Sequence, residues 1–263
     1  MSNNKIENHY DEQAELYQNS PKSTMPDLFV RNLEIKKIQD YIKNFNIKKN
    51  TRIVDIGCGN GYTITKLSKK FSCDFIGIDS NQKMIDLALK RKQKKVKFMK
   101  DSILKSNLKS NSFDIVYTQR CLINLENKQN QKKSINEIHR ILKKGGIFIM
   151  IEAFEDGLKE LNSARKVLGL KKIPPSWHNY YFNKFFLKKI FEGKFIDQVS
   201  KSKTKFNYES FLSSYYFGSR VIYPSLIDGK NKIIYNNNFA KFFSLMPNYG
   251  NYSQIQACVV QKI

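Results

Sequence analysis

Cysteine, proline and long apolar runs are all scarce in this chain of 263 residues. The four cysteines stand at positions 58, 73, 121 and 258, and without a C-x-x-C pair their spacing excludes a disulfide framework or a zinc ribbon. The longest apolar run, residues 147–154, contains Glu152 and is too short to span a membrane. The first residues are polar and lack the apolar core of a signal peptide, so we expect a cytoplasmic protein.

Acidic residues are outnumbered two to one by basic residues, which gives a formal net charge of +23. Such an excess is often a sign of nucleic-acid binding. However, 39 of the 46 basic residues are lysines spread along the whole chain, and 26 asparagines accompany only six alanines, as an AT-rich coding sequence would give. We therefore interpret most of the charge as a solvated surface and keep nucleic acid as the alternative partner.

The order of the apolar patterns predicts an α/β fold. Short β-branched runs predict buried strands, and amphipathic patterns predict helices between them. The strands are expected at 51–56, 74–78, 96–99, 113–118 and 146–151, and the helices at 62–70, 81–93 and 129–142, the last ended by Gly145 and Gly146. This alternation indicates a parallel sheet with helices on both faces.

We expect a single domain, because no flexible linker or internal repeat is present. A helical cap at 1–45 precedes the α/β core at 46–155. An elaborated segment at 156–250 follows on the substrate side, and 251–263 contains a closing strand.

The stretch Val54-Asp-Ile-Gly-Cys-Gly-Asn-Gly61 leaves a strand and opens a helix, which is where open α/β sheets bind ligands. Asp79 ends the next strand, 22 residues after Gly57, where an acidic side chain can accept hydrogen bonds from a ribose diol. The glycine spacing is G-x-G-x-G rather than the dinucleotide fingerprint, and Asp55 would oppose a pyrophosphate. We therefore expect no NAD binding.

These residues resemble the class I S-adenosylmethionine-dependent methyltransferases. The resemblance rests on the glycine loop and Asp79 together with Asp101, Phe113-Asp-Ile-Val116 and Leu142-Lys-Lys-Gly-Gly-Ile147, in the family's order over about residues 46–155. It implies a Rossmann-like, mostly parallel sheet of seven strands whose last strand is antiparallel, which suits residues 254–262. It also implies S-adenosylmethionine as the cofactor.

The resemblance assigns expected roles to individual residues. Gly57 and Gly59 would pass beneath the methionine part of the cofactor, Asp55 would lie near its amino group, and Asp79 with Ser80 would meet the ribose. The remaining expected cofactor residues surround the adenine and the methyl-transfer site: Met84, Asp101, Ser102 and Gln119. Arg31, in the cap, would either reach the cofactor carboxylate or be solvated.

The segment after the fourth strand restricts the type of acceptor. Thr118-Gln-Arg-Cys121 has neither the Asn/Asp-Pro-Pro-aromatic motif of base-amine methyltransferases nor a Pro-Cys nucleophile. The chain is also similar to a bacterial group of small-molecule methyltransferases associated with surface-sugar pathways. Five segments carry this similarity: residues 120–125, 151–152, 157–162, 177–181 and 219–221. A sugar, a nucleotide-sugar or another small polar acceptor is the expected substrate.

The acceptor site is expected in the C-terminal half. Trp177, His178, Asn179 and Tyr181 bring aromatic faces, an imidazole and an amide together in one segment. His178 is the expected general base because its ordinary pKa is near 6.5, and Glu152, at the end of the fifth strand, is the alternative. Arg120 should lie at the rim, where it would bind an anionic acceptor, orient Glu152 or form a structural ion pair.

Two other functions stay open at this point. An RNA-directed methyltransferase would use the net charge of +23. A catalytically silent cofactor-binding protein would keep the glycine loop and Asp79 without turnover.

Overall fold

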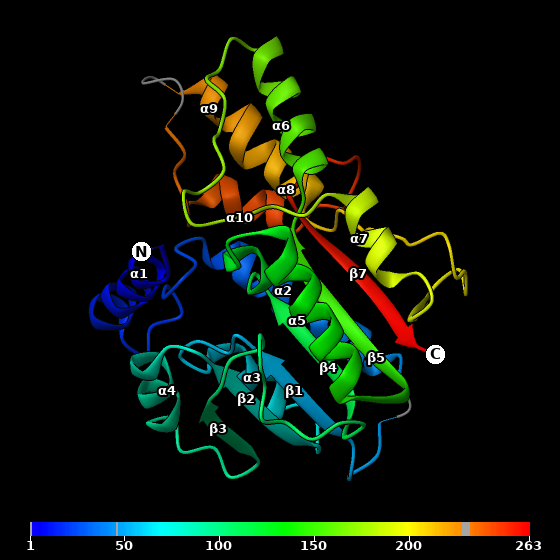
Figure 1. The fold of residues 1–263 in the computed structure, drawn as a ribbon. Helices are drawn as coiled ribbons and strands as arrows, with labels where there is room; N and C mark the ends of the chain where they lie inside the picture. Colours follow the sequence, from blue (N-terminus) through cyan, green and yellow to red (C-terminus); the bar gives the residue numbers. More distant parts are fainter. Residues whose placement is uncertain (1, 46, 228–231) are drawn as a thin grey trace.

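The computed structural model describes residues 2–45, 47–227 and 232–263. A seven-stranded sheet runs through it in the order β3-β2-β1-β4-β5-β7-β6 (Figure 1). Strands β1 to β5 pair in parallel, whereas β7 is antiparallel to both β5 and β6. The strands are β1 Arg52–Ile56, β2 Asp74–Asp79, β3 Val96–Lys100, β4 Phe113–Gln119, β5 Leu142–Ala153, β6 Phe195–Asp197 and β7 Ile255–Lys262. The expected fold class is therefore confirmed.

Alternate side chains of each strand pack on opposite faces of the sheet. Val54 and Phe148 belong to a core formed with helices α5 and α7, whereas Ile53 and Ile149 belong to a core formed with α2 and α3. Figure 1 accordingly shows α5 and α2 on opposite faces. The bounds of the flanking helices are α2 Leu28–Lys43, α3 Tyr62–Ser68, α4 Gln82–Leu89, α5 Lys128–Ile141 and α7 Lys184–Phe191.

The N-terminal cap consists of two helices joined by a loop. Helix α1, Ser2–Tyr17, is followed by a loop and then by α2, whose first turn is capped by the Asp27 carboxylate. Helix α1 lies beside α4, where Lys83 forms ion pairs with Asp11 and Glu15. The cap thereby reaches the carboxyl end of β2.

Apart from α7 and β6, the segment between β5 and β7 forms a helical cluster beyond the carboxyl end of the sheet (Figure 1). Its helices are α6 Glu155–Val167, α8 Ser213–Phe217, the π-helix η2 Gly218–Ile222, α9 Tyr223–Leu226 and α10 Asn238–Ser244. A Cβ on Gly218 would overlap the Phe243 ring, so glycine is what allows α10 to pack directly on η2. This packing fixes the segment that carries Arg220.

Two glycines have a different role from the expected one. Helix α5 ends at Ile141, and Gly145 and Gly146 lie inside β5, where Gly145 has a φ of 75°. The strand therefore begins before the glycines instead of after them. Within the part of the chain that the structure describes, no helix has the length and hydropathy needed to cross a bilayer.

Candidate functional site

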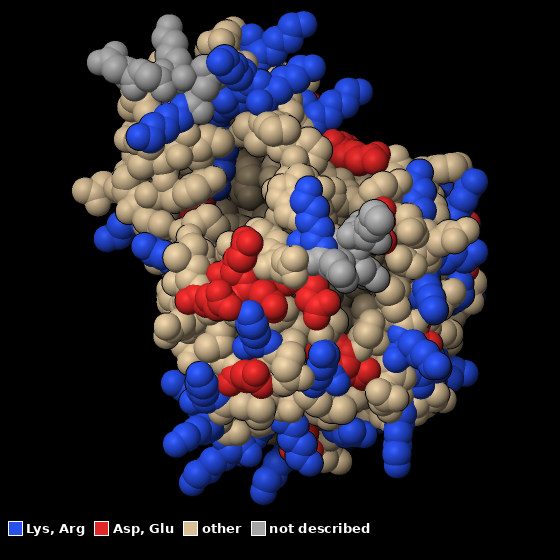
Figure 2. Space-filling view, turned by 60° about the vertical axis from the view of Figure 1, so that its left-hand side comes forward, with Lys and Arg blue, Asp and Glu red and all other residues tan. Residues whose placement is uncertain are grey.

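A cavity of about 730 Å³ opens at the carboxyl ends of β1, β2, β4 and β5. Its volume lies in the upper half of the range for small-molecule sites, roughly 300–1,000 Å³. The walls come from α1, the loop before α2, the glycine loop and the C-terminal helical cluster. Figure 2 shows a hollow on this face of the molecule, with a group of acidic side chains beside it. The fold thus brings segments from all parts of the chain to one site.

The glycine loop forms part of the cavity wall. Gly57 and Gly59 have φ values of 75° and 52°, which side chains disfavour. A Cβ on Gly57 would overlap Cys121, whereas a Cβ on Gly59 would meet no described atom within 4 Å. A ligand can therefore approach the backbone at Gly59, and the side chain of a larger residue would prevent this approach.

Three aspartates make one end of the cavity acidic. Burial raises the pKa of Asp55 to about 7, and it raises that of Asp79 as well. The Asp79 carboxylate accepts the N–H groups of Gly59 at 2.8 Å and Asn81 at 2.9 Å. Asp101 accepts four hydrogen bonds that hold its own loop together, from the backbone of Ser102 and Asn107 and the side chains of Ser106 and Asn107. Three further expected cofactor residues also line the cavity: Ser80, Met84 and Ser102.

Arg120 has its carboxylate partner on α2. Its Nε donates to Glu34 at 2.9 Å and one terminal nitrogen donates to the Thr24 carbonyl oxygen at 3.0 Å. Gln119 also donates to Glu34, at 2.6 Å, and accepts a hydrogen bond from Thr63. Glu34 is fully buried. Arg120 lines the cavity as expected, but it does not orient Glu152.

The expectation that Glu152 points into the crevice is wrong. Its side chain is fully buried and does not belong to the cavity wall. The carboxylate accepts backbone N–H groups from Cys121, Leu122 and Ile123 at 3.1, 3.0 and 3.2 Å, and burial raises its pKa to about 7. These three hydrogen bonds hold the carboxylate against the loop that follows β4. Glu152 therefore supports the 3₁₀ turn η1, Leu122–Asn124, and does not face a methyl acceptor.

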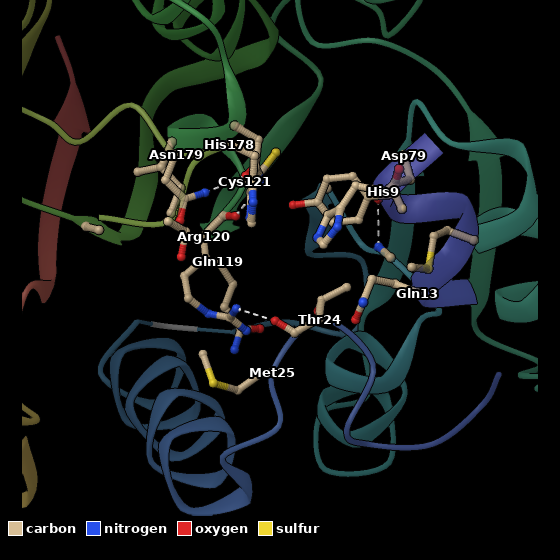
Figure 3. A pocket seen from close by; sticks show the side chains of 18 of the residues that line it. His9, Gln13, Thr24, Met25, Asp79, Gln119, Arg120, Cys121, His178 and Asn179 are labelled. Atoms are coloured by element: carbon tan, nitrogen blue, oxygen red, sulfur yellow. Dashed lines mark hydrogen bonds between the residues drawn. The ribbon is translucent and has the colours of Figure 1, made fainter. Parts of the chain in front are cut away.

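His178 lies at the cavity next to His9 of α1, with the ring centroids 4.6 Å apart (Figure 3). Burial, with a smaller contribution from His9, lowers the pKa of His178 to about 4. Its Nδ1 atom is buried and forms no hydrogen bond with the described residues. The imidazole is therefore neutral near pH 7 and can accept a hydrogen bond, but it is a weaker base than an ordinary histidine.

The neighbours of His178 separate into two groups. Asn179 and Tyr181 line the cavity, and the Asn179 amide donates to Asn124 at 2.8 Å. Trp177 lies outside the cavity wall and is 58% exposed, with Lys5 above its ring at 4.9 Å. Trp177 is thus placed on the outer side of its loop, because the loop turns His178 inward.

Several cavity residues were missed at the level of sequence. Tyr216 and Arg220 come from the C-terminal cluster, and Tyr235 follows in a later loop. Tyr10, in the cap helix α1, also lines the cavity. Burial raises the pKa of both Tyr10 and Tyr216, so both hydroxyls stay protonated. One signal was available for Arg220, since arginine is rare in this lysine-rich chain.

The parallel sheet, the glycine loop and the acidic residue ending β2 define a class I methyltransferase. The chain belongs to the methyltransferase domain family, which matches residues 47–203. The class and its cofactor, S-adenosylmethionine, are thereby confirmed. Among the described residues, no group of three His, Cys, Asp or Glu side chains is placed to hold a metal ion.

Curated relatives match the chain only in part. An uncharacterized protein of Methanocaldococcus jannaschii is 33% identical over 130 residues, which cover 49% of this chain and 53% of that protein. Sterol 24-C-methyltransferase of Aspergillus fumigatus is 27% identical over 120 residues, which cover 42% of this chain and 31% of that enzyme. The chain thus spans about half of the first relative's length and a third of the second's.

Two solved structures show the same fold. A methyltransferase of Methanosarcina mazei, described as S-adenosylmethionine-dependent, has a TM-score of 0.55 at 17% identity, covering 85% of this chain and 97% of its own. Phosphoethanolamine N-methyltransferase 1 of Haemonchus contortus, in complex with phosphoethanolamine and S-adenosylhomocysteine, has a TM-score of 0.60 at 13% identity. That comparison covers 99% of this chain and 48% of the other.

Proposed function

We propose that this protein transfers a methyl group from S-adenosylmethionine to an oxygen or nitrogen atom of a small polar acceptor. The observation that carries the proposal is one continuous cavity, which joins the glycine loop and Asp79 to a second region lined by Tyr, His and Asn side chains. The bound cofactor supplies the methyl group as an activated sulfonium substituent. The protein's residues have to bind both molecules, align them and exclude water.

The acidic end of the cavity suits the cofactor. The Asp79 carboxylate accepts two backbone hydrogen bonds and keeps lone pairs for the ribose hydroxyls. Asp55 is proposed to face the cofactor ammonium group, and Met84 and Ser102 the adenine. Arg31 is only 5% exposed, yet its Nε has no hydrogen-bond partner among the described residues. It is proposed to bind the cofactor carboxylate.

The acceptor region is proposed to lie between the loop at 176–181 and the C-terminal cluster. His178 is the candidate that accepts a proton or a hydrogen bond from the acceptor, and Asn179 and Tyr181 are candidates for positioning it. Arg120 and Gln119 border the site from the β4 end. A sugar or a nucleotide-sugar is the proposed acceptor class, supported by the aromatic and amide side chains of this wall.

A donor-labelling screen tests the proposed function. Purified protein with S-adenosylmethionine carrying a labelled methyl group is mixed separately with sugar nucleotides, small amines and RNA. Label transfer to a sugar nucleotide or an amine, lost in Gly59→Val, supports the proposal, because the new side chain would occupy the open space at Gly59. Transfer to RNA alone would contradict it, and so would the absence of S-adenosylhomocysteine binding.

A further inference from the structure

Every cationic side chain on the cavity wall is an arginine. Arg31, Arg120 and Arg220 line the cavity, and no lysine does so among the described residues. The chain has only seven arginines among 46 basic residues, so arginine is strongly enriched on the cavity wall relative to the whole chain. A guanidinium binds phosphate and carboxylate groups through paired, planar hydrogen bonds, which a lysine ammonium cannot form.

The arginines face an array of charges on one side of α2. Asp27, Arg31 and Glu34 are spaced at i, i+4 and i+7, and all three are buried. Arg220 pairs with Asp27 at 2.5 Å, and Arg120 pairs with Glu34 at 2.9 Å. No described residue forms an ion pair with Arg31. Three guanidiniums thus face two carboxylates, and one buried positive charge remains in excess.

The bound cofactor would offer its carboxylate to Arg31, as proposed above, and so balance this charge. Its sulfonium, however, adds a further positive charge near the transfer site. A buried positive charge is costly unless it is balanced, so a second ligand that brings negative charge would stabilise the loaded cavity. Because Asp55, Asp79 and Asp101 lie at the carboxyl ends of β1, β2 and β3, an anion is favoured only near the arginines.

Arg220 has the geometry of a preformed anion site. It is 5% exposed, and its guanidinium lies 4.5 Å from the Tyr216 ring centroid and 5.1 Å from that of Tyr235. Its two terminal nitrogens donate to Ser219 and Asp27, and the side chain also interacts with the Tyr215 hydroxyl. Nε forms no hydrogen bond with a described residue, so this donor remains available. The π-helix that carries Arg220 is a rare element that frequently occurs at functional sites.

We propose that the acceptor carries a phosphate or carboxylate group, and that Arg220, between Tyr216 and Tyr235, binds this group. This inference rests on the proposed function and specifies the substrate class of the same site. The anionic group anchors the acceptor on the C-terminal cluster, while its reacting oxygen or nitrogen lies toward His178 and Asn179.

Calorimetry on protein saturated with S-adenosylhomocysteine tests this inference, with inorganic phosphate and acetate as separate probes. The main variant is Arg220→Lys, which keeps a cation beside Asp27 and so protects the fold. The matched control is Arg52→Lys, because Arg52 also stacks on a ring, that of Phe113 at 4.9 Å, but lies outside the cavity. Circular dichroism confirms that both variants are folded.

We expect one of the two anions to bind, and Arg220→Lys to weaken that binding by about tenfold, the scale of one hydrogen bond to a charged group. Arg52→Lys and the affinity for S-adenosylhomocysteine should change by less than about twofold, within experimental scatter. Preference for phosphate or for acetate identifies the anion. Vesicles of anionic phospholipid form a third arm, and binding to vesicles without binding to free phosphate assigns the phosphate to a lipid headgroup.

Several results would overturn the inference. If neither anion nor the vesicles bind to the loaded protein, or if anion binding is unchanged in Arg220→Lys, the subsite does not exist. Loss of anion binding only in Arg31→Lys would assign the anion to the proposed cofactor-carboxylate position. Turnover of glucose but not glucose 6-phosphate, or of ethanolamine but not phosphoethanolamine, would also overturn it while leaving the proposed function intact. Absence of S-adenosylhomocysteine binding would instead refute the proposed function.

Discussion

Asp79 combines two tasks in one carboxylate. It holds the glycine loop through the Gly59 N–H group, and it faces the cavity with its remaining lone pairs. The sequence predicts this position because strand, glycine loop and acidic residue are close along the chain. The Arg120–Glu34 pair joins residues 86 positions apart, so no local pattern could predict it. Arg220 and Asp27, 193 positions apart, were missed for the same reason.

The role of Asp79 leads to a quantitative expectation for Asp79→Ala. The affinity for S-adenosylhomocysteine should fall by about 1–3 kcal/mol, the cost of losing buried hydrogen bonds to a charged group. Isothermal titration calorimetry measures this loss. Asp74→Ala is the matched control, since Asp74 begins the same strand and is exposed. An unchanged affinity for Asp79→Ala would remove Asp79 from the ribose position.

The lowered pKa of His178 makes stability depend on pH in a defined direction. An unfolded histidine titrates near 6.5, whereas His178 in the folded protein titrates at about 4. Between these values the unfolded chain binds more protons, so the contribution of His178 to stability falls as pH decreases from 6.5 to 4. Urea unfolding at pH 7 and at pH 4.5 should therefore show a smaller loss for His178→Gln than for the wild type. Equal losses would show that His178 has an ordinary pKa.

At the scale of elements, local patterns predict strands and helices well, but they fail at the boundaries. The five parallel strands and the closing strand lie where their apolar runs predict them. Strand β6 has three residues, too few for a periodic signal, and only pairing with β7 makes it a strand. The glycines at 145 and 146 suggest a helix end, yet pairing with β4 extends β5 back to Leu142. Long-range pairing decides these cases.

The turn η1 depends on Glu152. Three backbone N–H groups, two of them buried, lose their acceptor in Glu152→Ala, so the free energy of unfolding should fall by on the order of 3 kcal/mol. Urea denaturation measures this loss. Glu155→Ala serves as the control, because Glu155 is exposed in the first turn of α6. Similar stabilities of the two variants would show that the Glu152 carboxylate does not support the turn.

At the scale of the whole molecule, the distribution of charged side chains indicates more about nucleic-acid binding than the net charge does. Figure 2 shows lysine and arginine side chains dispersed over the visible face, with acidic side chains beside the hollow. A groove for nucleic acid would instead need a continuous basic track. On the cavity wall, Asp55, Asp79 and Asp101 come from the carboxyl ends of β1, β2 and β3. Arg31 and Arg220 come instead from α2 and η2, and the buried Asp27 pairs with Arg220. The dispersed surface charge and the charged groups of the cavity are therefore separate features, and only the second is expected to bind the cofactor and the methyl acceptor.

This separation predicts how the protein responds to RNA. A net charge of +23 should bind RNA at low ionic strength through scattered lysines. Such binding should disappear near about 150 mM salt, because each phosphate contact releases counterions and the affinity falls steeply with salt. Fluorescence anisotropy across a salt series measures the slope, and labelled S-adenosylmethionine shows whether methyl groups reach the RNA. Because the dispersed charges lie outside the cavity, we expect binding without methylation. RNA methylation near about 150 mM salt, together with loss of that activity in Arg220→Lys, would mean that the cavity accepts a nucleotide of a polymer and would overturn the small-molecule assignment.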